Sequence, residues 1–183
     1  MRERILIASD HAGFALKEKL EAALKDMGFD VVDLGTNSEA SADYADYAHA
    51  LAAQVERGRA ERGVLLCGTG LGMSYAANRH PHVRAAVAWA PEIARLARQH
   101  NDANVLVLPA RFVDDAQAID ILTTWLDTPF EGGRHARRIE KVEVPNADGG
   151  AFNPMVNAGS TGRSIASPRR AWAYARATGK SPR

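Results

Sequence analysis

Short apolar runs alternate with longer amphipathic stretches along this chain of 183 residues, and this alternation constrains the fold more than any other feature. The runs are continuous and rich in β-branched residues, which is typical of strands covered on both faces of a parallel sheet. We therefore expect an α/β fold, a three-layer α/β/α sandwich with a parallel five-stranded sheet and right-handed crossovers. The expected strands are Ile5–Ala8, Val31–Leu34, Val64–Cys67, Val83–Trp89 and Asn104–Leu108.

The amphipathic stretches predict the helices. Leu16, Leu20 and Leu24 recur every four residues, which places them on one helix face. The expected helices are Phe14–Met27, Tyr44–Arg57, a helix beginning near Leu71, Pro91–His100, Asp114–Leu126 and a final helix from near Gly133 that carries Arg134 to Lys141.

The chain divides into a body, residues 1–145, and a C-terminal extension, residues 146–183. All acidic residues lie in 1–150, whereas residues 151–183 carry six basic residues and no acidic one. Gly, Ser, Pro and Arg dominate the extension, a composition typical of a flexible tail or of one docked on a partner subunit. Because the body is the acidic part, the sequence argues against a nucleic-acid-binding domain.

The sequence carries no sign of export or membrane insertion. Met1–Arg4 runs into an apolar strand without a signal-like core, and no apolar run approaches the length of a membrane span. Cys67 is the single cysteine, so the chain can form neither an internal disulfide nor a Cys-rich metal site. We expect a cytoplasmic protein with no membrane partner.

The glycine-rich segment Gly63–Met73 is the strongest candidate for chemistry. It predicts a strand ending at Cys67, a turn with the spacing Gly-x-Gly-x-Gly, and a helix beginning near Leu71. Glycines allow backbone N–H groups to converge on a small volume, which can bind phosphate or stabilise an oxyanion. The spacing differs from the dinucleotide-binding and P-loop patterns, so a nucleotide site is disfavoured.

Cys67 stands at the head of this turn. Amide dipoles favour a thiolate there, and a thiolate could remove a proton from a carbon next to a carbonyl group. The neighbouring N–H groups would then hold the enediolate oxygen. The alternative is that Cys67 is a small core residue that closes an apolar strand.

Asp10 and His11 follow the first predicted strand, so they share the sheet edge of Cys67 unless Asp10 only caps the next helix. His100 can shuttle a proton near neutral pH. It precedes a strand, however, and so lies at the opposite edge. To join the site, His100 must come from a neighbouring subunit or from a helix that bends over the cleft; otherwise it is a surface histidine.

Two arginines, Arg134 and Arg138, are spaced to share one helix face, where their guanidinium groups suit phosphate oxygens. Arg111, just after the fifth strand, is a third candidate phosphate ligand. The alternative for the pair is a solvated basic face.

Together these segments resemble the type B ribose-5-phosphate isomerase family, which includes the galactose-6-phosphate isomerase subunits. The resemblance implies a Rossmann-like fold and a homodimer or dimer of dimers with active sites shared between subunits. It also implies aldose–ketose isomerisation of a sugar phosphate without a metal or a cofactor. The matching stretches are Ser9–Gly13, Asp43–Ala48, Gly63–Asn78, Ala94–Arg111 and Phe130–Lys141.

By this resemblance Cys67 is the base that moves a proton between C1 and C2 of ribose 5-phosphate. Members without this cysteine use a glutamate near the start of the following helix, where this chain has Met73. His100 would open the sugar ring. The other implied roles are ring opening for Asp10 and Thr69, the anion hole for backbone groups of Gly68, Gly70, Leu71 and Gly72, contacts to sugar hydroxyls for Asn101, lining of the pocket for Tyr44, and phosphate binding for His11, Arg111, Arg134 and Arg138.

Two other functions remain open at this stage. The substrate could be a four- or six-carbon sugar phosphate, such as erythrulose, allose or galactose phosphate. The protein could instead be a non-catalytic sugar-phosphate or nucleotide binding module, which would bind its ligand without turnover and be indifferent to thiol alkylation.

Overall fold

The computed structural model describes residues 2–142, so the predicted C-terminal extension lies outside the described residues. Within residues 2–142, five strands form one sheet in the order β2-β1-β3-β5-β4, and every neighbouring pair is parallel. The strands are β1 (Arg4–Ser9), β2 (Asp30–Asp33), β3 (Arg62–Cys67), β4 (Ala85–Val87) and β5 (Val105–Pro109).

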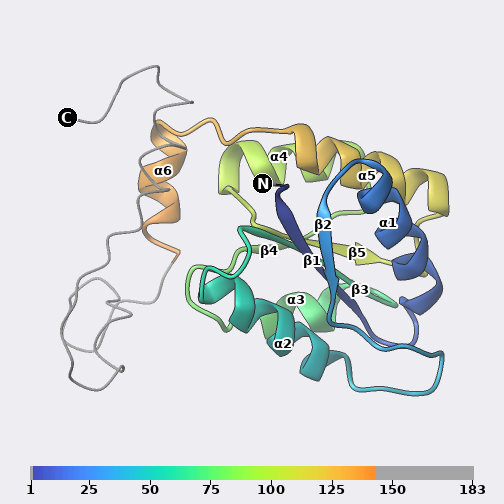
Figure 1. Cartoon of the computed structure of the whole chain (residues 1–183). Helices are drawn as coiled ribbons and strands as arrows, with labels where there is room; N and C mark the ends of the chain where they lie inside the picture. The colour runs from blue at the N-terminus through green and yellow to red at the C-terminus, as the bar shows by residue number, and fades with distance from the viewer. Residues whose placement is uncertain (1, 143–183) are drawn as a thin grey trace.

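Helices cover both faces of this sheet (Figure 1). Successive residues of a strand face opposite layers, so Ile5 and Ile7 pack with α1, α4 and α5, whereas Leu6 and Ala8 pack with α2 and α3. The predicted three-layer sandwich is thus confirmed. The helices are α1 (Phe14–Asp26), α2 (Tyr44–Glu56), α3 (Leu71–Ala77), α4 (Pro91–Asn101), α5 (Asp115–Asp127) and α6 (Arg134–Ile139).

The fourth strand is shorter than the apolar run that predicts it. Val83–Trp89 was expected, and only Ala85–Val87 pairs with β5. The preceding residues belong to a turn: the Val83 N–H donates to the His80 carbonyl, and the Arg84 N–H donates to the Asn104 side chain. The run therefore marks the strand correctly but also includes its flanking turn.

The strand register defines two edges of the sheet. Ser9 pairs with Leu66 and Cys67 pairs with Pro109, so β1, β3 and β5 end together at what we call the carboxyl edge. Gly63 pairs with Val105 at the opposite, amino edge. None of the helices in residues 2–142 is long and apolar enough to cross a membrane.

Candidate functional site

The glycine turn after β3 folds back over the end of that strand. Gly70 has φ +76°, a left-handed conformation that glycine adopts without steric cost. In this conformation the Gly70 N–H donates a hydrogen bond to Sγ of Cys67 at 3.2 Å. The sulfur therefore has a hydrogen-bond donor on the side of the turn.

Cys67 is only 4% exposed and packs within the core layer between the sheet and helices α2 and α3. The thiol therefore combines features of both predictions, because it is a core side chain at the carboxyl edge that keeps a small opening to solvent. Met73, which the resemblance places at the alternative glutamate position, is fully buried in the same layer.

Asp10 lies beside Cys67 because its N–H donates to the Leu66 carbonyl at 3.2 Å. Its Oδ1 accepts hydrogen bonds from the N–H groups of Ala12 at 2.9 Å and Gly13 at 3.1 Å. Asp10 thus shapes the turn before α1 but does not cap the helix, because the N-cap residue is Gly13 and no side chain caps it. Within residues 2–142 its Oδ2 accepts no hydrogen bond, so this oxygen is available to a ligand.

The His11 ring is held by the loop that precedes α2. Its Nδ1 accepts a hydrogen bond from the Ala42 N–H at 3.2 Å. An accepting ring nitrogen carries no proton, so this bond places the proton of the neutral imidazole on Nε2. His11 can therefore offer an Nε2–H donor to an anion at the carboxyl edge.

Two glycines of the turn let larger side chains lie directly on its backbone. A Cβ at Gly68 would lie 3.2 Å from Nε of Arg111, and a Cβ at Gly72 would lie 2.5 Å from the Tyr44 ring. The Arg111 N–H also donates to the Gly68 carbonyl at 3.1 Å. The structure thus brings together at the carboxyl edge Asp10, His11, Tyr44, Cys67, the turn Gly68-Thr69-Gly70-Leu71-Gly72, and Arg111.

Gly72→Ala should displace the Tyr44 ring from the turn. Tyr44 is 46% exposed and can move, so we expect a stability loss within about 1 kcal/mol. KM for a substrate bound at this edge should rise by about tenfold, because the ring no longer lines the site. Steady-state kinetics and thermal unfolding measure both. The matched control is Gly72→Ala in a Tyr44→Ala background, where no further rise in KM is expected; a rise there would contradict a clash with Tyr44.

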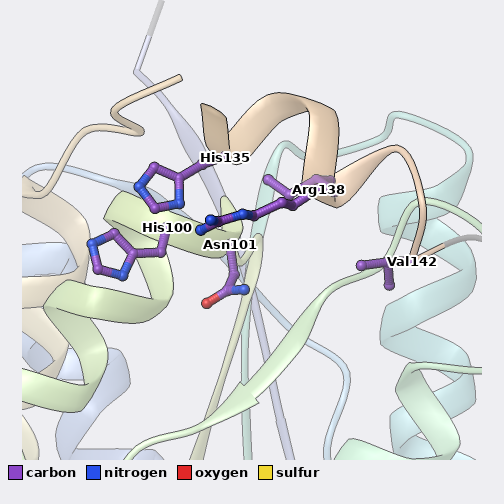
Figure 2. Close-up of a pocket in the computed structure, with 6 residues that line it drawn as sticks. His100, Asn101, His135, Arg138 and Val142 are labelled. Carbon is purple, nitrogen blue, oxygen red and sulfur yellow. The ribbon is translucent and has the colours of Figure 1, made fainter. Parts of the chain in front are cut away.

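His100 and Asn101, the last residues of α4, lie at the amino edge. With Arg138 of α6 they line a cavity of about 270 Å³ (Figure 2). Arg134, one helical turn earlier on α6, is exposed. Four residue steps of β5 separate this edge from Cys67, roughly 13 Å at about 3.3 Å per residue. One chain therefore does not bring His100 to Cys67, as the topology predicts.

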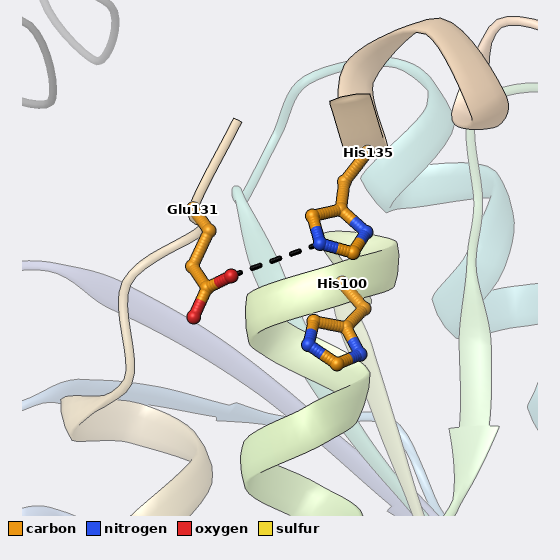
Figure 3. Close-up of side chains that lie close together, drawn as sticks. All are labelled: His100, Glu131 and His135. Carbon is orange, nitrogen blue, oxygen red and sulfur yellow. Dashed lines mark ion pairs between the residues drawn. The ribbon is translucent and has the colours of Figure 1, made fainter. Parts of the chain in front are cut away.

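His135 lies flat against His100 in this cavity (Figures 2 and 3). The ring centroids are 4.4 Å apart, and the ring planes are within 5° of parallel. Nε2 of His135 lies 3.7 Å from a carboxylate oxygen of Glu131. Neither His135 nor Glu131 stands out in the sequence, where the only signal is an imidazole between two candidate phosphate-binding arginines.

The pKa of His135 lies below the usual histidine value. Burial is the main cause, since charging an imidazole away from water is costly, and His100, Arg134 and Arg138 add repulsion. Glu131 acts in the opposite direction but does not compensate. His135 is therefore neutral at neutral pH.

His100, Glu131 and His135 place three potential metal-binding atoms within 4.8 Å of one another. An imidazole nitrogen offers its lone pair in the plane of the ring, however, so two stacked rings do not aim at one ion. The only other such group in residues 2–142 is Glu18, Glu21 and Asp33, to which Lys17 and Lys25 bring their ammonium groups. In the first group the rings do not converge on one point, and in the second the carboxylates already pair with ammonium groups.

Comparison with known proteins gives consistent matches over the described part of the chain. Residues 5–142 match the family described as Ribose/Galactose Isomerase. Ribose-5-phosphate isomerase B of Escherichia coli K12 is 43% identical over 140 residues, which is 76% of this chain and 94% of that protein. A probable ribose-5-phosphate isomerase B of Mycoplasma genitalium is 46% identical over 144 residues, 78% of this chain and 95% of that one.

Solved structures match the fold as well. A ribose 5-phosphate isomerase of Thermotoga maritima superposes with a TM-score of 0.76 at 53% identity, covering 78% of this chain and 98% of that one. The Mycoplasma genitalium enzyme with bound ribulose 5-phosphate superposes with a TM-score of 0.75 at 46% identity, covering 78% and 95% of the two chains.

Proposed function

The chain belongs to the ribose/galactose isomerase family, and from this premise we propose that it interconverts ribose 5-phosphate and ribulose 5-phosphate. Its similarity to proteins named ribose-5-phosphate isomerase B, one of them solved with ribulose 5-phosphate, supports this substrate. The activity would place the enzyme in the pentose phosphate pathway of carbohydrate metabolism, in the cytoplasm.

Proton transfer at C1 and C2 is assigned to Cys67. The observation that carries this assignment is the hydrogen bond from Gly70 N–H to Sγ at the edge where Asp10 also lies. The thiolate would remove the proton from C2 of the open-chain aldose and return it to C1, while the hydroxyl proton of the enediolate moves from O2 to O1. The enediolate oxygen formed in between would be held by the N–H groups of the glycine turn.

Ring opening precedes this step, because ribose 5-phosphate is mostly a closed furanose. The C1–O bond of the ring breaks, His100 protonates the ring oxygen, and the carboxylate of Asp10 takes the proton of the C1 hydroxyl. Thr69 assists from the turn, Asn101 binds sugar hydroxyls, and Tyr44 lines the pocket. The phosphate is bound by His11, Arg111, Arg134 and Arg138.

We further propose that a second copy of the chain completes each active site. Cys67 and Asp10 lie at the opposite edge of the sheet from His100, too far away for one bound sugar to contact all three within a single chain. Helix α6, which carries Arg134 and Arg138, projects from the body (Figure 1), so it can reach a partner. A homodimer, or a dimer of dimers, would place His100 of one chain against Cys67 of the other.

A panel of aldose phosphates of four to six carbons, assayed for ketose formation without added metal, tests the proposed function. We expect ribose 5-phosphate to give the highest kcat/KM. A higher value for a four- or six-carbon sugar would reassign the substrate. The absence of turnover with every sugar, together with sugar binding, would favour the binding module.

His100→Asn should slow ring opening without stopping proton transfer. Turnover of ribose 5-phosphate should fall by about 10²-fold, the loss typical of a missing general acid. Ribulose 5-phosphate has its C5 oxygen esterified and is already open, so exchange of its C1 hydrogen with deuterated water should stay within about threefold of wild type. NMR in deuterated buffer measures the exchange. Equal losses in the two assays would count against ring opening by His100.

A further inference from the structure

We propose that His135 is a positioning residue for ring opening, whose imidazole serves as the flat surface that fixes the plane of the His100 ring. The inference rests on the proposed isomerase function, in which His100 protonates the ring oxygen of the sugar. His135 itself is not assigned a proton transfer.

The backbone holds His135 firmly in place. The Glu131 N–H donates to the Gln99 carbonyl at 3.1 Å, which ties the segment before α6 to the last turn of α4. The Glu131 carboxylate lies beside Nε2 of His135, and the His135 residue is only 6% exposed. The His135 ring is therefore packed into the protein before any substrate binds.

His100 needs such a surface because nothing intrinsic fixes its ring. The last side-chain torsion of histidine has a broad energy profile, so the ring can rotate about it. His100 is partly exposed at the end of α4 and has no hydrogen bond from its ring within residues 2–142. The stack on His135, 4.4 Å between centroids and 5° from parallel, is the contact that sets the ring plane.

The charge state of His135 suits this role. Burial and the neighbouring cations lower its pKa, so His135 presents a neutral ring face. The face of a neutral aromatic ring attracts a cation, whereas a second imidazolium would repel it. His100 can therefore carry its proton against His135, with Arg134 and Arg138 nearby to bind the phosphate.

Two substitutions in the full-length protein test the proposal. His135→Asn removes the ring and keeps a polar side chain, and His135→Phe keeps a flat neutral ring. We expect the asparagine variant to turn over ribose 5-phosphate about 10-fold to 100-fold more slowly. The phenylalanine variant should stay within about threefold of wild type. Both should retain C1 hydrogen exchange of ribulose 5-phosphate, which reports an intact Cys67 centre.

Only this combination of results for the two variants supports the proposed positioning role of His135. Loss of exchange in either variant would mean that His135 maintains the fold or the whole site, and failure of phenylalanine to restore turnover would mean that the flat ring is not what matters. Unchanged turnover in the asparagine variant would likewise overturn the proposal. If the wild-type protein shows neither turnover nor exchange, the proposed function fails rather than the role of His135.

Discussion

Cys67→Ser is expected to lower kcat for ribose 5-phosphate by about 10³-fold. Proton transfer by a positioned acid or base contributes about 10²–10⁴-fold to the rate of such reactions. A serine hydroxyl has nearly the shape of the thiol but is a far weaker base. The change leaves the turn, the Gly70 N–H and the surrounding core layer in place. Exchange of the C1 hydrogen of ribulose 5-phosphate should fall with turnover, in contrast to the His100→Asn variant.

The single cysteine makes this prediction unusually easy to control. Iodoacetamide can alkylate no other thiol, so activity and free thiol should disappear together, and ribose 5-phosphate should slow both losses. Thermal unfolding of Cys67→Ser should stay close to that of wild type. Near-wild-type turnover in the serine variant, or full activity of the alkylated protein, would remove Cys67 from the mechanism.

The sequence was sufficient to predict the architecture because both periodicities are strong. Leu16, Leu20 and Leu24 mark one face of α1, and all three are buried against the sheet. The glycine turn was also predictable, because Gly70 has a left-handed backbone conformation that glycine adopts most easily. The strand order was not, because nothing local in β4 or β5 states that β5 inserts between β3 and β4.

Side-chain contacts between segments that are distant in the sequence could not be predicted from local sequence patterns either. The sequence allows Asp10 to be either a helix cap or a functional carboxylate, and the structure gives its two oxygens different surroundings. The role of His135 is not visible in the sequence, because it depends on a stack with His100, a residue 35 positions earlier. Spacing places residues on a helix face, but only tertiary packing says what that face meets.

Restoration of activity by mixing two inactive variants is the second large effect that we expect. If each site uses Cys67 of one chain and His100 of its partner, a dimer of Cys67→Ser with His100→Asn contains one intact site and one doubly altered site. Random reassortment after unfolding and refolding makes about half of the dimers mixed, so about a quarter of wild-type activity should return. Each parent alone should show about 1% or less with ribose 5-phosphate.

The matched control is a mixture of two variants whose altered residues lie at the same edge of the sheet. Cys67 and Asp10 lie side by side at the carboxyl edge, so they belong to the same half-site whatever the partner supplies. Mixing Cys67→Ser with Asp10→Asn leaves every site with one altered residue, and no activity should return. Recovery in the first mixture alone would show that the two edges meet across an interface. Failure of the first mixture to recover, with dimers formed, would require His100 to reach Cys67 within one chain, which the register of β3 and β5 opposes.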